Sequence, residues 1–372
     1  MKIIADKNIP YLKGIAELFG EVTYLDGAAF TQETIKDADT LIVRTVTHFD
    51  ENILKDTAVK LICSATIGYD HIDTGYCDSH GIAWTNAPGC NSGSVQQYIT
   101  SALITMSRKK GFNLKDKTIG IVGVGNVGKK VAKACEVLGM KVLLNDPPRQ
   151  AKEGGNDFVS LQTIMDEADI ITFHTPLTKD GEYKTYHLAD ADFFSSLIKK
   201  PVIINSARGG IIDTNAIKTA LRKGDISGAV IDCWENEPDI DLEYLNMADI
   251  ATPHIAGYSA DGKANATRMS LTAIADFYHL SEAPVFLVKE PEPANPVIDM
   301  NKYTDPDNRI YGAILETYNP VGDYSRLINN PAAFKKSRNE YPLRREYFAY
   351  NIMNATNVEV DVLSKLGFRT TL

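Results

Sequence analysis

The chain has 372 residues, of which 44% are hydrophobic and 23% are charged, and this composition is ordinary for a globular protein of two or three domains. Its net charge of −9 speaks against general binding to nucleic acid or to an anionic membrane. Its five cysteines are scattered and include no Cys-x-x-Cys pair, which speaks against a disulfide framework or a cysteine zinc site and favours the reducing cytoplasm.

The N-terminal region alternates strand-like and helix-like pieces. Met1-Lys-Ile-Ile-Ala-Asp enters a strand at once without a signal-peptide core, and no apolar run approaches membrane-spanning length. The alternation predicts a small α/β domain with a parallel sheet. The expected strands cover residues 3–5, 22–25, 40–44, 61–65 and 82–84, and an amphipathic helix is expected over 11–19.

Two threonines stand at the ends of expected strands in this region. Thr45 follows one strand and Thr66 follows another, and the carboxyl ends of parallel strands are where ligands bind in open α/β sheets. We expect both hydroxyls to contact a ligand. On these residues alone, an equally good interpretation is that they satisfy local backbone groups in turns.

The stretch from Thr118 to Gly128 joins an apolar strand to a helix through a glycine motif, Gly123-Val-Gly125-Asn126-Val127-Gly128. Gly123 allows a tight turn, Gly125 lets the backbone approach a pyrophosphate, and Gly128 lets the helix lie close to the strand. The free N–H groups at the helix N-terminus then face the phosphates. A structural turn without a nucleotide is the alternative.

A second strand, Lys141–Asp146, ends in a carboxylate at the spacing expected for a ribose contact. Asp146 favours NAD over NADP, because its charge would repel a 2′-phosphate. Arg149 lies close enough in the sequence to leave NADP open.

The α/β alternation continues and then stops. A helix is expected over 94–108, strands over 170–174, 202–206, 229–232 and 250–252, and helices over 214–223 and 260–280. A proline-rich linker follows at 284–296. We therefore predict two Rossmann-like, doubly wound parallel-sheet domains and a small C-terminal α+β domain: 1–95 with 258–283, 96–257, and 284–372.

Three polar residues fall just past strand ends in the second domain: Arg208, Glu237 and His254. A histidine beside a carboxylate exchanges a proton near neutral pH, and an arginine holds a substrate carboxylate with two parallel bonds. Beside a nicotinamide, these groups would oxidise a 2-hydroxy acid. Taken singly, the histidine could be structural, the glutamate a solvated turn and the arginine a helix cap. No histidine pair has metal-ligand spacing with carboxylates, so no metal is expected.

The glycine motif together with Asn205–Asp213, Asp232–Pro238 and Pro253–Gly257 resembles the D-isomer-specific 2-hydroxyacid dehydrogenases over about the first 280 residues. Three further motifs, Ala65–His71, Ala87–Asn91 and Tyr341–Glu346, resemble one branch of that family, which acts on a phosphorylated four-carbon 2-hydroxy acid. The resemblance implies that Arg208, Glu237 and His254 are catalytic. It also implies NAD contacts from Asp146, Thr175, the turn Ser206-Ala207-Arg208, Asp232 and Gly257, and substrate contacts from Thr45, Thr66 and Tyr258.

The chain departs from the family pattern at two positions. Thr45 replaces an expected serine and keeps the hydroxyl, and Gln97 stands where many members have a glutamate. The second departure removes a charge near the helix that joins the domains.

A phosphorylated substrate needs cations, and Arg44 beside Thr45 supplies one. The tail from Lys335 to Glu346 is basic, and tails of this kind form a dimerisation domain in the resembled family. We hypothesise a homodimer in which Arg344 or Arg345 reaches the partner's cleft and helps to hold the phosphate. By composition alone, a solvated basic surface is the better interpretation.

Other functions stay open at this stage. The same groups would oxidise another 2-hydroxy acid, such as glycerate 3-phosphate, or reduce the corresponding oxo acid, such as glyoxylate. The fold could also serve an NAD-responsive regulator that binds partner proteins. A purely structural α/β protein would leave the ordered motifs unexplained.

Overall fold

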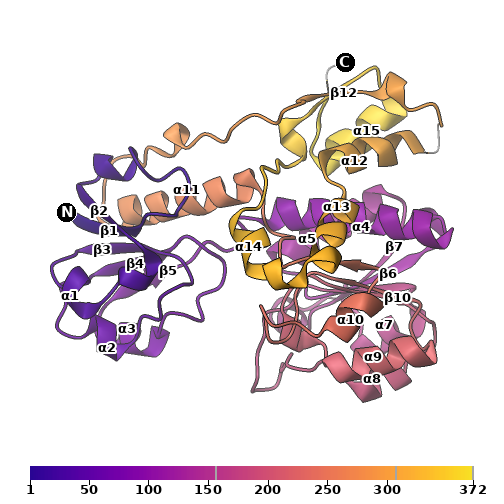
Figure 1. The fold of residues 1–372 in the computed structure, drawn as a ribbon, viewed down its shortest axis with the longest axis horizontal. Helices are drawn as coiled ribbons and strands as arrows, with labels where there is room; N and C mark the ends of the chain where they lie inside the picture. Colours follow the sequence, from indigo (N-terminus) through magenta and orange to yellow (C-terminus); the bar gives the residue numbers. More distant parts are fainter. Residues whose placement is uncertain (156, 306–307, 371–372) are drawn as a thin grey trace. The chain divides into compact units, whose positions relative to one another are not determined.

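The computed structural model describes residues 1–155, 157–305 and 308–370. The chain divides into two compact units: unit 1 contains Met1–Asn91 and Ser259–Glu292, and unit 2 contains Ser92–Tyr258 and Pro293–Leu372. Each unit has its own parallel sheet, and unit 2 also carries a small C-terminal sheet with helices (Figure 1). The predicted α/β class with Rossmann-like sheets is confirmed, whereas the division into three domains stays a prediction.

Unit 1 is built on five parallel strands in the order β2-β1-β3-β4-β5. Its inner strands β3 and β4 are buried along their whole length, as is usual for parallel strands that are covered on both faces. The long helix α11 packs against β4 and contributes Ala264, Leu271 and Ile274 to the core. The elements are β1 (Lys2–Asp6), β2 (Glu21–Leu25), α1 (Gln32–Ile35), β3 (Thr40–Val43), α2 (Glu51–Leu54), β4 (Leu61–Ser64), α3 (Thr74–Ser79), β5 (Ala83–Thr85) and α11 (Ala260–Phe277).

The helix expected over residues 11–19 is wrong. Only a short 3-10 turn, Ala16–Leu18, forms there. Tyr11 and Gly14 have φ angles of 62° and 87°, and a helix cannot run through residues in the left-handed region. The apolar periodicity reflects burial of Leu12, Ile15 and Phe19 in the core of unit 1 rather than an α-helix.

Unit 2 is built on six parallel strands in the order β11-β10-β9-β8-β6-β7. Helices cover both faces: Ile119 and Ile121 of β6 pack in one core cluster with α4 and α5, and Val122 packs in another with α7. The elements are α4 (Ser92–Lys110), β6 (Thr118–Val122), α5 (Asn126–Val137), β7 (Lys141–Asn145), α6 (Pro147–Glu153), α7 (Leu161–Glu167), β8 (Ile170–Phe173), α8 (Ala191–Ser195), β9 (Val202–Asn205), α9 (Thr214–Lys223), β10 (Gly228–Ile231), α10 (Leu242–Met247) and β11 (Ile250–Ala251).

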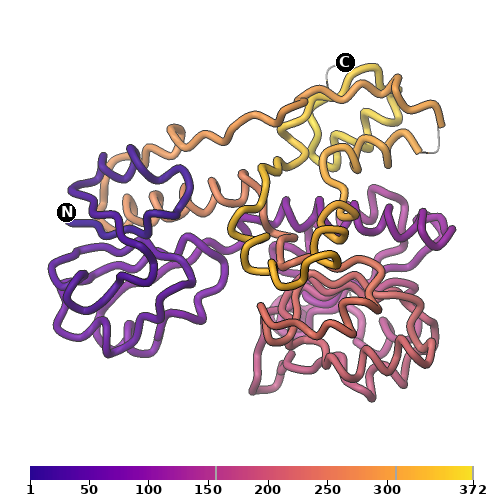
Figure 2. Tube along the Cα trace, viewed as in Figure 1, coloured from indigo at the N-terminus to yellow at the C-terminus, as the bar shows by residue number. Residues whose placement is uncertain are grey.

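The C-terminal segment from residue 293 packs against helices that cover the six-stranded sheet of unit 2. Helices α12 and α13 contact α4, and α15 contacts α5, as the yellow trace beside the magenta one shows (Figure 2). Gln97 on α4 is fully buried and donates to Thr317 Oγ1 at 3.1 Å and to the Arg345 carbonyl at 2.9 Å. A glutamate could not donate these two bonds, which explains the departure from the family pattern at this position.

The tail elements are β12 (Val297–Asp299), α12 (Arg309–Thr317), α13 (Pro320–Asn329), α14 (Phe334–Asn339), β13 (Asn351–Met353), α15 (Asn357–Leu366) and β14 (Arg369–Thr370). The three strands form a parallel sheet in the order β12-β13-β14. Over the described residues, no helix is both long enough and apolar enough to cross a membrane.

Candidate active site

Three loops at the carboxyl edge of the unit 2 sheet carry Arg208, Glu237 and His254. Each loop follows one of the adjacent strands β9, β10 and β11. A Cβ at Gly209 would lie 1.9 Å from the Trp234 carbonyl oxygen, so the Arg208 loop packs directly against the loop that leads to Glu237. The sheet order therefore brings the sequence-predicted residues to one edge.

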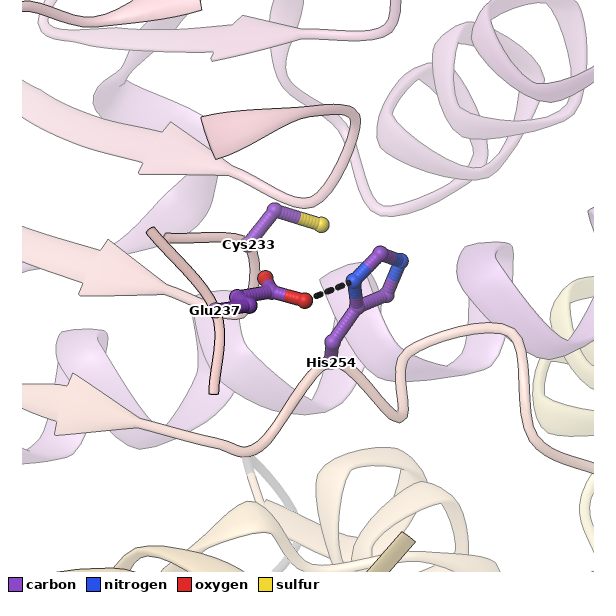
Figure 3. Close-up of side chains that lie close together, drawn as sticks. All are labelled: Cys233, Glu237 and His254. Atoms are coloured by element: carbon purple, nitrogen blue, oxygen red, sulfur yellow. Dashed lines mark hydrogen bonds and ion pairs between the residues drawn. The ribbon is translucent and has the colours of Figure 1, made fainter. Parts of the chain in front are cut away.

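Glu237 and His254 form a hydrogen-bonded pair. His254 Nδ1 lies 2.8 Å from Glu237 Oε2, and the other ring nitrogen points away from the carboxylate (Figure 3). A carboxylate only accepts hydrogen bonds, so Nδ1 donates and Nε2 is left to accept a proton. The other carboxylate oxygen, Glu237 Oε1, accepts from the Trp234 N–H at 2.8 Å.

The local charges keep Glu237 ionised. Burial alone would raise the pKa of its carboxyl group. The hydrogen bond and charge of His254, the Trp234 N–H and the charge of Arg338 lower the pKa by more than burial raises it, so the pKa lies below its ordinary value. An ionised carboxylate fixes the imidazole orientation and stabilises the imidazolium that forms when Nε2 takes a proton.

Asp232 anchors the backbone around His254. Its buried carboxylate accepts hydrogen bonds from Thr252 Oγ1 at 2.6 Å and from the N–H groups of Ile255 and Ala256 at 2.7 and 3.0 Å. His254 itself has a φ of 55°, a conformation that a non-glycine residue adopts only when its surroundings impose it. The Asp232 side chain therefore shapes the His254 loop, and its contact with NAD stays a prediction.

Cys233 adds a thiol to the pair. Its sulfur and the ligand atoms of Glu237 and His254 all lie within 4.8 Å of one another, a grouping that could hold a metal ion and that sequence spacing did not indicate (Figure 3). Burial and nearby carboxylates raise the pKa of the thiol well above its ordinary value, and metal ligation requires the thiolate. The arrangement therefore favours acid–base chemistry by Glu237 and His254 over metal binding.

Arg208 is half-buried, and its Nη1 donates to the Ala207 carbonyl at 2.8 Å. The charge of Arg208 lowers the pKa of Cys233, which places the guanidinium in the electrostatic environment of the pair. A guanidinium with further N–H groups available in this loop can bind a carboxylate.

The glycine motif has the geometry that a dinucleotide requires. Gly123 has a φ of 90°, and a Cβ at Gly128 would lie 2.0 Å from the Gly123 carbonyl oxygen, so strand and helix approach closely there. A Cβ at Gly125 would meet nothing within 4 Å. Asn126 and Val127 begin α5, whose first N–H groups have no partners within the helix. This loop fits a pyrophosphate.

Asp146 follows β7 and faces the glycine loop. One carboxylate oxygen accepts from the Val124 N–H at 2.8 Å, and the other caps α6 through the Arg149 N–H at 3.1 Å. The Arg149 guanidinium is held by Glu153 and by the Val124 carbonyl. Because the arginine charge is already neutralised by Glu153, the carboxylate of Asp146 determines the local sign, which fits NAD rather than NADP.

Two other expected NAD contacts are hydroxyls without partners. Thr175 Oγ1 follows β8 and Ser206 Oγ follows β9, and both atoms are buried and lack a hydrogen-bond partner within the part of the chain that the structure describes. Buried polar groups are normally satisfied, so both hydroxyls fit a bound cofactor. Ala207 N–H donates to Asn205, and Gly257 lies in the loop between His254 and Tyr258.

In unit 1, the expected substrate contacts stand at the carboxyl ends of β3 and β4. Thr45 is exposed, and Thr66 Oγ1 donates to the Gly68 carbonyl at 3.0 Å. The Arg44 guanidinium binds both carboxylate oxygens of the buried Asp6, at 2.9 and 3.3 Å. Its charge is therefore already paired within unit 1.

The tail arginines differ in position. Arg344 is 5% exposed and donates to Ser94 Oγ and to the Ala256 carbonyl, and Arg345 is 4% exposed. Both are buried within this chain's own unit, so neither guanidinium is placed to extend into the cleft of a partner. Arg338 of the tail does lie at the site, and sequence reasoning did not select it. Its Nη1 lies 3.8 Å from Glu237 Oε2 and its guanidinium faces the Tyr258 ring. Only the basic composition of the tail pointed towards it.

Comparison with known proteins supports an NAD-binding domain and a dehydrogenase site in unit 2. Residues 92–256 match the family described as D-isomer specific 2-hydroxyacid dehydrogenase, NAD binding domain, and residues 290–367 match a domain of unknown function. The NAD⁺-bound 3-phosphoglycerate dehydrogenase of Entamoeba histolytica has a TM-score of 0.64 and 30% identity, covering 76% of this chain and 97% of that one. Fold and site together define an NAD-dependent oxidoreductase of the D-isomer-specific 2-hydroxyacid dehydrogenase class.

Relatives that match this chain over nearly its full length, including the tail, show which branch of the class it belongs to. Erythronate-4-phosphate dehydrogenase of Bacteroides thetaiotaomicron is 53% identical over 354 residues, which cover 95% of this chain and 99% of the relative. The enzyme of that name from Porphyromonas gingivalis is 44% identical over 369 residues, covering 99% of this chain and 100% of the relative. The chain belongs to the family of the erythronate-4-phosphate dehydrogenases.

Proposed function

We propose that this protein oxidises 4-phospho-D-erythronate at C2 with NAD, giving 3-hydroxy-2-oxo-4-phosphooxybutanoate, as a step towards pyridoxal 5′-phosphate. The observation that carries the chemistry is the Glu237–His254 pair, joined at 2.8 Å beside the Arg208 loop. The family membership supports the choice of substrate.

The side chains of the site divide the reaction between them. Arg208 binds the C1 carboxylate and stabilises the charge that develops on the C2 oxygen. His254 Nε2 takes the proton of the C2 hydroxyl, and Glu237 stabilises the resulting imidazolium. NAD, when bound, supplies the hydride acceptor. The glycine loop, Asp146, Thr175, Ser206, Ala207 and Gly257 would hold the cofactor, Asp232 supports the loop, and Tyr258, Thr45 and Thr66 would contact the substrate.

The test is a panel of 2-hydroxy acids with NAD, with and without a terminal phosphate. We expect 4-phospho-D-erythronate to give the highest kcat/KM, and glycerate 3-phosphate, glycolate (the hydroxy acid that corresponds to glyoxylate) and unphosphorylated erythronate to be poorer. A higher kcat/KM for another acid would show that this acid, and not 4-phospho-D-erythronate, is the substrate. Absence of turnover with every acid, together with NAD binding, would favour an NAD-responsive regulator.

The same assay tests the proton acceptor. His254→Ala should lower kcat by about 10²–10⁴, because a general base is lost, and should leave the dissociation constant of NAD nearly unchanged, because the glycine loop holds the dinucleotide. Turnover within a few-fold of the parent protein would show that His254 is not the base.

We further propose that the protein works in the cytoplasm as a homodimer that is formed through the C-terminal segment. The support is two exposed apolar side chains on the outer face of the small sheet, where Asp299 and Asn351 also lie: Val297 is 44% exposed and Met353 is 46% exposed, whereas Ile298 and Ile352 on the inner face are buried. Exposed apolar side chains on a sheet face offer a surface that a second copy of the chain could cover.

A further inference from the structure

The proposed substrate carries a phosphate dianion, and the arginines first considered for it are otherwise engaged. Arg44 is bound through two atoms to Asp6 in unit 1. Arg344 is buried between Ser94, the Ala256 carbonyl and the Tyr318 ring. Its Nε and Nη1 have no hydrogen-bond partner among the described residues, but the residue is only 5% exposed, so a phosphate cannot reach these atoms. A cation that receives a substrate group must instead lie beside the catalytic pair and keep donor atoms available.

Arg338 meets these conditions. It stands in α14 and is partly exposed, with 30% of its side-chain surface accessible. Its guanidinium lies over the Tyr258 ring, 5.6 Å from the ring centre, and its Nη1 lies 3.8 Å from Glu237 Oε2. Its Nε is buried and has no hydrogen-bond partner over residues 1–155, 157–305 and 308–370.

The contact with Glu237 does not satisfy this guanidinium. The two oxygens of Glu237 already accept from His254 and Trp234 at 2.8 Å each, and 3.8 Å is beyond hydrogen-bond distance. The position of Arg338 is thus set by a charge interaction and by stacking on Tyr258, while its donors stay available. An incoming oxyanion could bind these donors through charge-assisted hydrogen bonds.

We propose that Arg338 is a substrate-binding residue, held over Tyr258 beside the Glu237–His254 pair, and that it receives the terminal phosphate of the substrate from within the same chain. This assignment rests on the proposed function, in which Arg208 binds the carboxylate at the other end of the substrate. It places phosphate recognition on the C-terminal segment, and it needs no arginine from a partner.

The kinetic test compares Arg338→Ala and Arg338→Lys with Lys336→Ala. Lys336 lies on the same helix with 72% of its side chain exposed and a weak contact to Glu340 at 3.9 Å, so its removal controls for loss of tail charge. Loss of charge-assisted bonds should lower kcat/KM for 4-phospho-D-erythronate about ten- to a hundredfold, mainly through KM. Unphosphorylated D-erythronate should change by less than about threefold, and Arg338→Lys should recover part of the loss.

Two kinetic outcomes would overturn the proposal. Equal losses for both acids in Arg338→Ala would mean that Arg338 only positions Glu237 and Tyr258. Unchanged kinetics for both would mean that it contributes nothing to binding. If the alanine variant is unstable, the comparison uses Arg338→Gln, which retains side-chain volume.

Binding of inorganic phosphate separates this proposal from the proposed function. Phosphate should raise the melting temperature of the NAD-bound parent protein and of Lys336→Ala, but not of Arg338→Ala. This readout does not need turnover, so an inactive protein that still shows the difference would contradict only the proposed substrate. Equal phosphate shifts in all three proteins, or no shift in any of them, would overturn the Arg338 assignment.

Discussion

At the residue scale, the carboxylate of Asp146 has a structural role and a proposed cofactor-binding role, and a substitution can separate the two. It caps α6 through the Arg149 N–H and presents a negative charge beside the glycine loop. Asp146→Ser keeps a capping oxygen but removes the charge. We therefore expect the melting temperature to change little and the ratio of NADP to NAD affinity to rise about tenfold or more. Titration with both cofactors checks this, and an unchanged ratio would remove the ribose assignment.

His174 gives a pH dependence whose sign follows from burial. Burial lowers the pKa of its imidazole from 6.5 to about 3, so the ring stays neutral in the folded protein and takes a proton first in the unfolded chain. Stability that is present above pH 6.5 is then lost as the pH falls towards 3. At pH 5 the loss amounts to about 2 kcal/mol.

Replacement of His174 by glutamine should therefore flatten the acid side of the stability curve. Denaturant midpoints at pH 7 and pH 5 should differ less in His174→Gln than in the parent protein. The pH 7 values serve as the control for any loss of packing. An identical pH dependence in the two proteins would show that His174 is not buried in neutral form.

The grouping of candidate site residues could be predicted from the sequence where it depends only on the order of the strands. Arg208, Glu237 and His254 each follow a strand, and adjacent parallel strands bring their ends together. Arg338 could not be selected in this way, because its place beside Glu237 depends on how a tail helix packs some hundred residues further along. Cys233 could not be selected either, since nothing in the spacing of the scattered cysteines shows that its sulfur lies near Glu237 and His254.

At the element scale, the turn from β6 to α5 separates a folding role from a binding role. A methyl group at Gly125 meets nothing within 4 Å, whereas one at Gly128 would overlap the Gly123 carbonyl at 2.0 Å. Gly125→Ala should fold like the parent protein but bind NAD at least about tenfold more weakly, because the methyl group occupies space needed by the pyrophosphate. Gly128→Ala should lose about 1–3 kcal/mol of stability as well.

Calorimetric NAD titration and thermal unfolding of both variants provide the measurement. NAD affinity in Gly125→Ala equal to that of the parent would show that the pyrophosphate does not approach this glycine. A fully stable Gly128→Ala would show that helix and strand can separate without cost.

Elements with uninterrupted apolar runs were predicted within a residue or two. The runs 170–174 and 202–206 became β8 and β9, and the amphipathic stretch 214–223 became α9. The error at 11–19 has a local cause: apolar spacing reports which side chains are buried, but it does not report the left-handed backbone at Tyr11 and Gly14. Gly14 inside this stretch is the residue that indicates a break in the helix.

At the scale of the whole molecule, the C-terminal segment is part of the core of unit 2. Ile298, Ile314, Tyr347 and Ile352 share one buried cluster with residues of α4, α5 and β6. The sequence showed a change of composition after residue 284 but not this packing, because the contacts join positions about two hundred residues apart. Removing the segment would expose that cluster, so truncation is a poor test of assembly and a point substitution on the outer sheet face is a better one.

Met353→Asp supplies that substitution. The register pairs Asp299 with Met353 and Val297 with Asn351, so Val297 and Met353 lie on the face of the small sheet opposite to the buried Ile298 and Ile352. If this face joins two copies of the chain, an unpaired carboxylate buried there should weaken the dimer by about a hundredfold or more. Ile198→Asp is the control, since Ile198 is 73% exposed and lies before β9 rather than in the tail. Sedimentation equilibrium should show a dimer for the parent protein and for Ile198→Asp and a monomer for Met353→Asp, with NAD affinity retained in all three. A monomeric parent protein would contradict the homodimer, and a dimer that survives Met353→Asp would place its interface on another surface.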